Sequence, residues 1–226
     1  MTLFLDAINH IIPMTLGIVA SPSPMIAIII LLMTHRAKSN ATSFLLGWYT
    51  GLIGVGLIVL IIPGLAEKST YTPSNIAWGR FILGIVFLII SIFIARKIPR
   101  KGRQAPPPSW LSKLDSFGFL QSFAFGFFFA APNIKNSSLV AAGMTSINHF
   151  GLRLDQELLI LVIFCLIASI GVLIPPAVYL LIRGNAESVF SAMKKWLIMN
   201  RALILFLLLI IIGSLWVYQG VLILFP

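Results

Sequence analysis

A single lysine interrupts a long apolar stretch in the second half of the sequence. Lys135 is the only charged residue within residues 116–147 and lies near their middle. A lysine near a bilayer centre costs about 2.5–3.5 kcal/mol on insertion scales, so it requires water, a partner or a function. Pro132 and Asn133 precede it, and Asn136 and Ser137 follow it. These side chains predict a basic, hydrogen-bonding patch that suits an anionic or hydroxyl-rich group. The alternative is that the span ends near Pro132 and Lys135 snorkels to an interface.

A second unusual stretch, Ser21-Pro22-Ser23-Pro24, lies within an apolar run of the first half. Proline lacks a backbone donor and clashes with the preceding turn, so a helix is expected to open near Ser21 to Ser23. Backbone groups freed at membrane depth must face protein or a wet cavity. A helix restarting at Pro24 would point amide donors and a positive dipole end into that cavity.

The two stretches occupy equivalent places in the chain. Each opens one half of the sequence, and each combines an apolar run, small residues, proline and polar neighbours. Three spans per half would insert the halves in opposite senses, and inverted repeats with interrupted helices are typical of transporters. A simple proline kink remains the alternative for each break. The pairing favours a substrate-binding site made of Ser21, Pro22, Ser23, Pro24, Pro132, Asn133, Lys135, Asn136 and Ser137.

The composition requires a membrane protein to hold these residues in place. Hydrophobic residues make up 59% of the 226-residue chain and charged residues only 10%, whereas about a quarter of a soluble domain is charged. A helix needs about 20 apolar residues to cross a bilayer. Six stretches qualify: 7–33, 41–66, 76–95, 116–147, 158–182 and 202–226. The expected fold is all-α and integral to the membrane. It has six transmembrane helices in two inverted three-helix repeats, with the first and fourth helices broken. Pro175-Pro176 is expected to break the fifth.

The basic residues orient this arrangement. Twelve of the sixteen lysines and arginines fall on one side of a six-span topology. These are Arg36, Lys38, Arg96, Lys97, Arg100, Lys101, Arg103, Lys113, Arg183, Lys194, Lys195 and Arg201. The positive-inside rule makes that side cytoplasmic, with both termini outside the cytoplasmic membrane. The net charge of +10 then reflects topology and attraction to anionic phospholipids, and no nucleic acid is needed to explain it.

The domain organisation follows from the spans. Residues 1–95 form the first predicted repeat, 96–115 a basic, proline-rich cytoplasmic linker, and 116–226 the second repeat. Within residues 186–199, apolar side chains at helical spacing lie beside Lys194 and Lys195, which predicts a helix in the cytoplasmic interface. An extension of the last span is the open alternative.

Enzymatic chemistry is not expected. The six acidic residues are all terminal or in loops, Cys165 is the only cysteine, and no nucleotide-binding loop or metal-ligand spacing occurs. The sequence therefore predicts no catalytic residues, no metal site and no cofactor.

Several of these residues resemble a known family. Ala20 to Ala27, the basic turn His35 to Lys38 and the run Phe44 to Trp48 look like the glycopeptidolipid-addressing protein family of the lysine-exporter superfamily. That family's second half carries an Asn-Pro-Lys-Asn-type motif, which Pro132, Lys135 and Asn136 match with looser spacing. The resemblance implies six-span transporters that export or flip envelope lipids or their glycosylated precursors.

The resulting prediction is a transporter that works by alternating access around the two breaks. Lys135 would bind a phosphate, sulfate or carboxylate of a membrane lipid or lipid-linked glycan, and a homodimer is left open. Two alternatives stay open: an exporter of amino acids or other small polar solutes, and a non-transporting membrane scaffold for glycolipid assembly.

Overall fold

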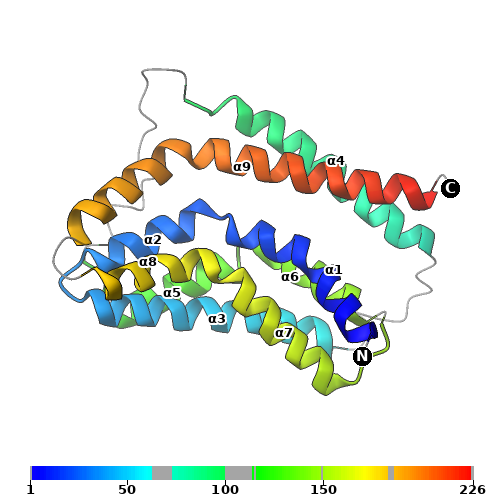
Figure 1. Ribbon diagram of the computed structural model, residues 1–226, viewed down its shortest axis with the longest axis horizontal. Coiled ribbons are helices and arrows are strands. Elements are labelled where there is room, and N and C mark those ends of the chain that lie inside the picture. The colour runs from blue at the N-terminus through cyan, green and yellow to red at the C-terminus, as the bar shows by residue number, and fades with distance from the viewer. Residues whose placement is uncertain are drawn as a thin grey trace. The chain divides into compact units, whose positions relative to one another are not determined.

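The computed structural model describes residues 2–62, 73–99, 114, 116–148, 150–182 and 186–224, and the regular structure among them is entirely helical. The helices are α1 (Thr2–Val19), α2 (Pro22–Leu32), α3 (Ala37–Ile61), α4 (Pro73–Ala95), α5 (Phe119–Ala130), α6 (Ile134–Asn148), α7 (Leu154–Ala168), α8 (Ile170–Leu181) and α9 (Ala186–Leu224) (Figure 1). The all-α prediction is confirmed at this level. Most of the predicted linker 96–115 lies outside the described residues.

Three of these helices are long and apolar enough to cross a membrane: α3, α4 and α9. Two further spans result if the bent pairs α1–α2 and α7–α8 each count as one. The chain is therefore a helical membrane protein by length and composition. The predicted fourth span is present as two short helices, α5 and α6, of which only α5 is strongly apolar.

The helices group into two compact units. The first contains residues 1–66 and 106–198, and the second contains residues 67–105 and 199–226. Each unit combines segments from both predicted repeats, so the units do not test where the repeats begin and end. Residues 186–199 form the beginning of the continuous α9, and their location in the cytoplasmic interface stays a prediction.

In the first unit, α3 packs closely along α5. A Cβ on Gly47 would lie 2.0 Å from the Phe123 carbonyl oxygen, and one on Gly126 would lie 2.0 Å from that of Phe44. Only glycine allows two backbones to approach this closely, as in other membrane helix pairs. This close contact at Gly47 and Gly126 positions the start of α5 beside the start of α3. In the second unit, Phe87 of α4 stacks on Trp216 of α9 with ring centroids 5.4 Å apart.

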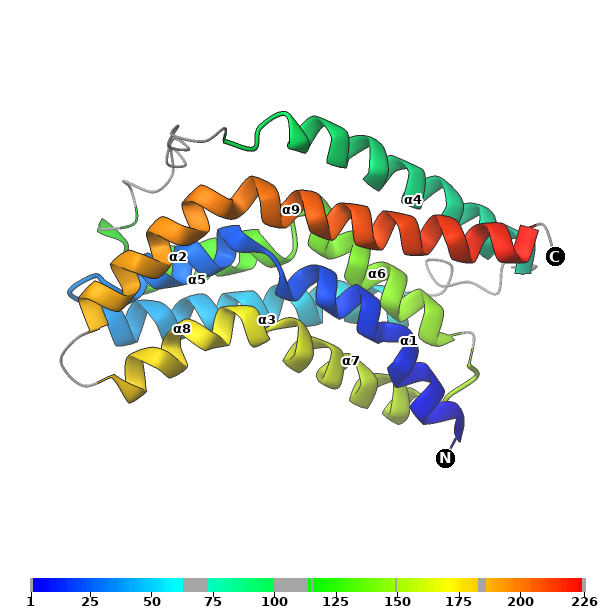
Figure 2. The same cartoon turned by 45° about the horizontal axis from the view of Figure 1, so that its top comes forward.

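The two bent pairs of the first unit run side by side. The pair α1–α2 bends by 56° and the pair α7–α8 by 58°, and α1 packs on α7 while α2 packs on α8 (Figure 2). The prediction that Pro175-Pro176 breaks the fifth span is wrong. Both prolines lie inside α8, and the break is at Ser169. The two prolines remove the hydrogen bonds to the Gly171 and Val172 carbonyls, which lie inside α8, and the helix continues through them.

Candidate functional site

The break between α1 and α2 follows directly from Pro22. In a continuous helix the Pro22 nitrogen would donate to the Ile18 carbonyl, but proline has no N–H. The Ser21 N–H donates to Ile18 instead, at 3.1 Å. A regular helix would have paired that N–H with the Gly17 carbonyl. Gly17 therefore loses its helical donor, and a buried carbonyl in this position requires another one.

Lys135 supplies the missing donor. Its Nζ donates to the Gly17 carbonyl at 2.8 Å and to the Ser21 hydroxyl at 2.5 Å. The side chain is half-buried, and among the described residues no carboxylate forms an ion pair with it. An ammonium has three donors, so these contacts use two. Lys135 thus compensates the α1 break with neutral acceptors, and its positive charge is not neutralised by any described side chain.

The break between α5 and α6 has a similar origin and a similar repair. α5 ends at Ala130, and Pro132 cannot continue the helix. The freed Phe129 carbonyl accepts a hydrogen bond from Asn136 Nδ2 at 2.8 Å. Asn133 precedes the first residue of α6, and its Oδ1 accepts a long hydrogen bond from the Asn136 N–H at 3.4 Å, which is the N-cap position where asparagine is favoured.

A direct contact joins the two breaks. The Ser21 hydroxyl is 3.5 Å from Asn136 Oδ1, and both side chains are buried. We call Gly17, Ser21, Phe129, Lys135 and Asn136 the Lys135 network. In this network Lys135 bonds to Gly17 of α1, and the next residue of α6, Asn136, bonds to Phe129 of α5. The two breaks are therefore linked through adjacent residues of one helix.

The remaining predicted site residues have different roles. Pro22 and Pro24 are buried in the first turn of α2 and shape its backbone, while Ser23 is half-buried and outside the network's hydrogen bonds. Pro132 is exposed. The Ser137 hydroxyl donates back to the Asn133 carbonyl at 2.9 Å. The structure therefore brings Ser21, Asn133, Lys135 and Asn136 together and gives the other residues a structural part.

The lengths of the helices set the depth of the network. α2 has 11 residues and α5 has 12, which correspond to about 16–18 Å at 1.5 Å per residue. On the other side of the two breaks, α1 has 18 residues and α6 has 15, which correspond to about 22–27 Å. Both breaks thus lie well inside their broken helices rather than at an end.

The third break lies in the fifth span, at Ser169 rather than at the predicted Pro175-Pro176. The buried Ser169 hydroxyl donates to the Cys165 carbonyl at 2.6 Å and accepts a hydrogen bond from Trp48 Nε1 at 3.0 Å. Two residues later, a Cβ on Gly171 would lie 2.3 Å from the Val19 carbonyl oxygen. The bend of α7–α8 is therefore packed against the bend of α1–α2. Gly171 was the available sequence signal.

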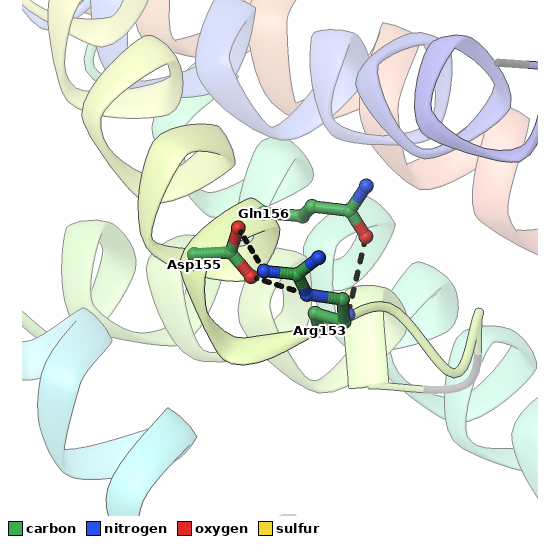
Figure 3. A network of polar contacts seen from close by, with 3 residues as sticks. All are labelled: Arg153, Asp155 and Gln156. Atoms are coloured by element: carbon green, nitrogen blue, oxygen red, sulfur yellow. Dashed lines mark hydrogen bonds and ion pairs between the residues drawn. The ribbon is translucent and has the colours of Figure 1, made fainter.

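A separate polar network caps the start of α7 (Figure 3). Arg153 Nε lies 3.0 Å from Asp155 Oδ1, and the Arg153 N–H donates to Gln156 Oε1 at 3.2 Å. Both charged side chains are largely exposed, so this pair contributes little to stability. Within the described part of the chain, no group of three or more histidine, cysteine or acidic residues could hold a metal ion.

Comparison with known proteins gives one match. A family model described as "Sap, sulfolipid-1-addressing protein" matches residues 11–222, which include both breaks and the whole Lys135 network. No curated protein and no solved structure matches the chain. The resemblance to lipid-addressing proteins is supported, whereas the assignment to the glycopeptidolipid-addressing family in particular stays a prediction.

Proposed function

Because the chain belongs to the sulfolipid-1-addressing protein family, we propose that it moves an anionic envelope lipid across the cytoplasmic membrane. The family description concerns the addressing of an envelope lipid, which favours a lipid over a small solute as the substrate. The proposed class is a lipid or glycolipid whose headgroup carries a sulfate or another anionic group. No covalent step is proposed, so the protein acts as a transporter and not as an enzyme.

The observation that carries the proposal is the Lys135 network. A half-buried ammonium without a carboxylate partner among the described residues lies at two helix breaks. A charged side chain within a membrane-spanning segment costs free energy, so its presence there indicates a function. Its third donor can bind a headgroup oxygen, and charge-assisted hydrogen bonds of this kind are about twice as strong as neutral ones.

The proposed topology has six spans in two inverted repeats, with both termini outside. The basic residues on the opposite side support that orientation. Alternating access would use the helix breaks as the points where the first unit opens to one side or the other. An anionic headgroup that binds the third donor of Lys135 would draw the ammonium away from the Gly17 carbonyl and so weaken the hydrogen bond that satisfies the α1–α2 break. Substrate binding is thereby coupled to the bend.

The proposal is tested with the full-length protein reconstituted in liposomes that contain a fluorescent sulfated glycolipid. Movement between leaflets is followed with a quencher that cannot cross the membrane. We expect Lys135→Ala to abolish movement and Lys135→Arg to retain part of it. Lys195→Ala removes the same charge from an exposed position on α9 and should move lipid at the wild-type rate.

The outcomes separate the competing functions. Movement of the sulfated lipid with undiminished activity in Lys135→Ala would refute the role given to the network. Absence of lipid movement, with efflux of amino acids from the same liposomes, would refute the lipid proposal and favour the small-solute exporter. If a normally folded protein shows neither lipid movement nor amino-acid efflux, a role as a non-transporting scaffold would be favoured.

A further inference from the structure

A pocket of about 440 Å³ lies at one end of the first unit, where α2 ends and α3 and α5 begin. Residues 34–36 of the turn between α2 and α3, Asn40 in the first turns of α3, and residues 116–118 and 121 around the start of α5 line it. Its volume is within the roughly 300–1,000 Å³ typical of small-molecule sites. We infer that this pocket binds the anionic, hydroxyl-bearing headgroup of the transported lipid before the headgroup reaches Lys135, an inference that rests on the proposed function.

The charge of the pocket favours an anion. The exposed Arg36 and His35 contribute to its lining, and no carboxylate belongs to its described lining. Two helices also begin here, with Arg36 and Gly118 as the N-caps of α3 and α5. Neither N-cap has a side chain bonded to the first turn. The first amides of a helix lack intrahelical partners, and the helix dipole adds positive potential there.

The polar groups of the wall favour a ligand with hydroxyl groups. Asn40 is completely buried, and its Nδ2 donates to the Phe117 carbonyl at 2.9 Å and to the Thr34 hydroxyl at 3.2 Å. Its Oδ1 accepts no hydrogen bond from any described residue. A buried acceptor left unpaired is unfavourable, so a donor that reaches the Asn40 side of the pocket would be stabilised. The exposed Gln121 side chain, which accepts from the Gly118 N–H at 2.7 Å, adds an amide that can donate.

The position of the pocket explains why it would act first. α2 and α5 both connect the pocket to the Lys135 network, in opposite chain directions. α2 begins beside Ser21 and ends before Thr34, whereas α5 begins at the pocket and ends beside Phe129. The two sites are thus about 16–18 Å apart along these helices, about half the thickness of a bilayer core. A network inside the membrane therefore puts the pocket at the interface, on the side of Arg36 and Lys38.

Direct binding to the full-length protein in detergent tests the inference, with glucose 6-sulfate as the probe and isothermal titration calorimetry as the readout. We expect Arg36→Gln to weaken binding about tenfold or more, as for a hydrogen bond to a charged group. Lys38→Gln is the matched control, because Lys38 is also an exposed basic residue but does not line the pocket. Gln121→Glu keeps an acceptor for the Gly118 N–H while adding a negative charge, so it should also weaken binding in a folded protein.

Two results with the variants would overturn the inference. The first is equal binding by Arg36→Gln and wild type, whether or not Lys135→Ala loses binding. The second is an equal loss in Lys38→Gln, which would indicate diffuse charge attraction. Glucose and inorganic sulfate must each bind more weakly than glucose 6-sulfate, since either binding equally well would contradict a headgroup that is both hydroxylated and anionic.

The lipid-movement assay on the same variants distinguishes a failure of this inference from a failure of the proposed function. Arg36-dependent binding without any lipid movement would refute lipid transport and leave the pocket as a site for a free sugar ester. Lipid movement that Arg36→Gln and Gln121→Glu leave unchanged would refute the pocket as a loading site and leave the transport proposal standing.

Discussion

The Lys135 ammonium nitrogen lies 2.8 Å from the Gly17 carbonyl oxygen, which is the acceptor that the helix break at Pro22 releases. The two residues are 118 positions apart. A defect that one half of the chain creates is therefore repaired by a charged side chain of the other half. A ligand that binds the third donor of Lys135 would act on this contact, and four predictions concern the helix breaks and helix contacts of the first unit.

Restoring the backbone donors at positions 22 and 24 should straighten the first span. In the double variant Pro22→Ala/Pro24→Ala the new N–H groups can bond to Ile18 and Ala20, the Ser21 N–H can return to Gly17, and Lys135 then loses an acceptor. Spin labels at Leu3 and Met33, in a Cys165→Ser background, should move apart by a few ångströms. Pro13→Ala is the control, because Pro13 lies inside the continuous α1 and its replacement should leave the distance unchanged. An unchanged distance in the double variant would show that packing alone holds the bend.

Replacing Asn136 should destabilise the fold through the second break. Asn136→Leu leaves the Phe129 carbonyl without its side-chain donor, and a buried unpaired acceptor costs about 1–3 kcal/mol. The free energy of unfolding, measured by titration with a denaturing detergent, should fall by that amount. Ser138→Ala, at an exposed position of the same helix, should change it by less than about 0.5 kcal/mol. Equal stability of the two variants would mean that Phe129 finds another donor.

The crossing of α3 and α5 should not tolerate a methyl group. A Cβ at position 126 would overlap the Phe44 carbonyl, so Gly126→Ala should lower the free energy of unfolding by about 1–3 kcal/mol or more. Gly54→Ala provides the contrast, because a Cβ at position 54 of α3 meets nothing within 4 Å. Alanine there should stabilise the helix by up to about 1 kcal/mol. Similar effects of the two substitutions would contradict the close contact.

The bend at Ser169 should depend on Trp48. A double-mutant cycle with Trp48→Phe and Ser169→Ala isolates the hydrogen bond from Trp48 Nε1 to the Ser169 hydroxyl. Interhelical hydrogen bonds in membranes contribute about 0.6 kcal/mol on average, and complete burial of both groups should give a coupling of about 0.5–1.5 kcal/mol. Additive effects of the two substitutions would show that the bond contributes nothing to stability.

Local chemistry made the first and second breaks predictable. Pro22 and Pro132 lack an N–H wherever the chain folds, so the helices end there for a reason contained in a few neighbouring residues. Hydrophobic composition also determined the helical membrane class, because so few charges could not cover a water-soluble surface.

Tertiary structure decided which groups meet. Nothing near Lys135 in the sequence indicates that its partners are Gly17 and Ser21, because hydrogen bonds between distant segments depend on how the helices pack. The same is true of Trp48 and Ser169, and packing decided that the fifth span bends at Ser169 rather than at Pro175. The pocket at Arg36 also required the fold, since its two walls are more than 75 residues apart in the chain and come together only because α3 and α5 cross at their glycines.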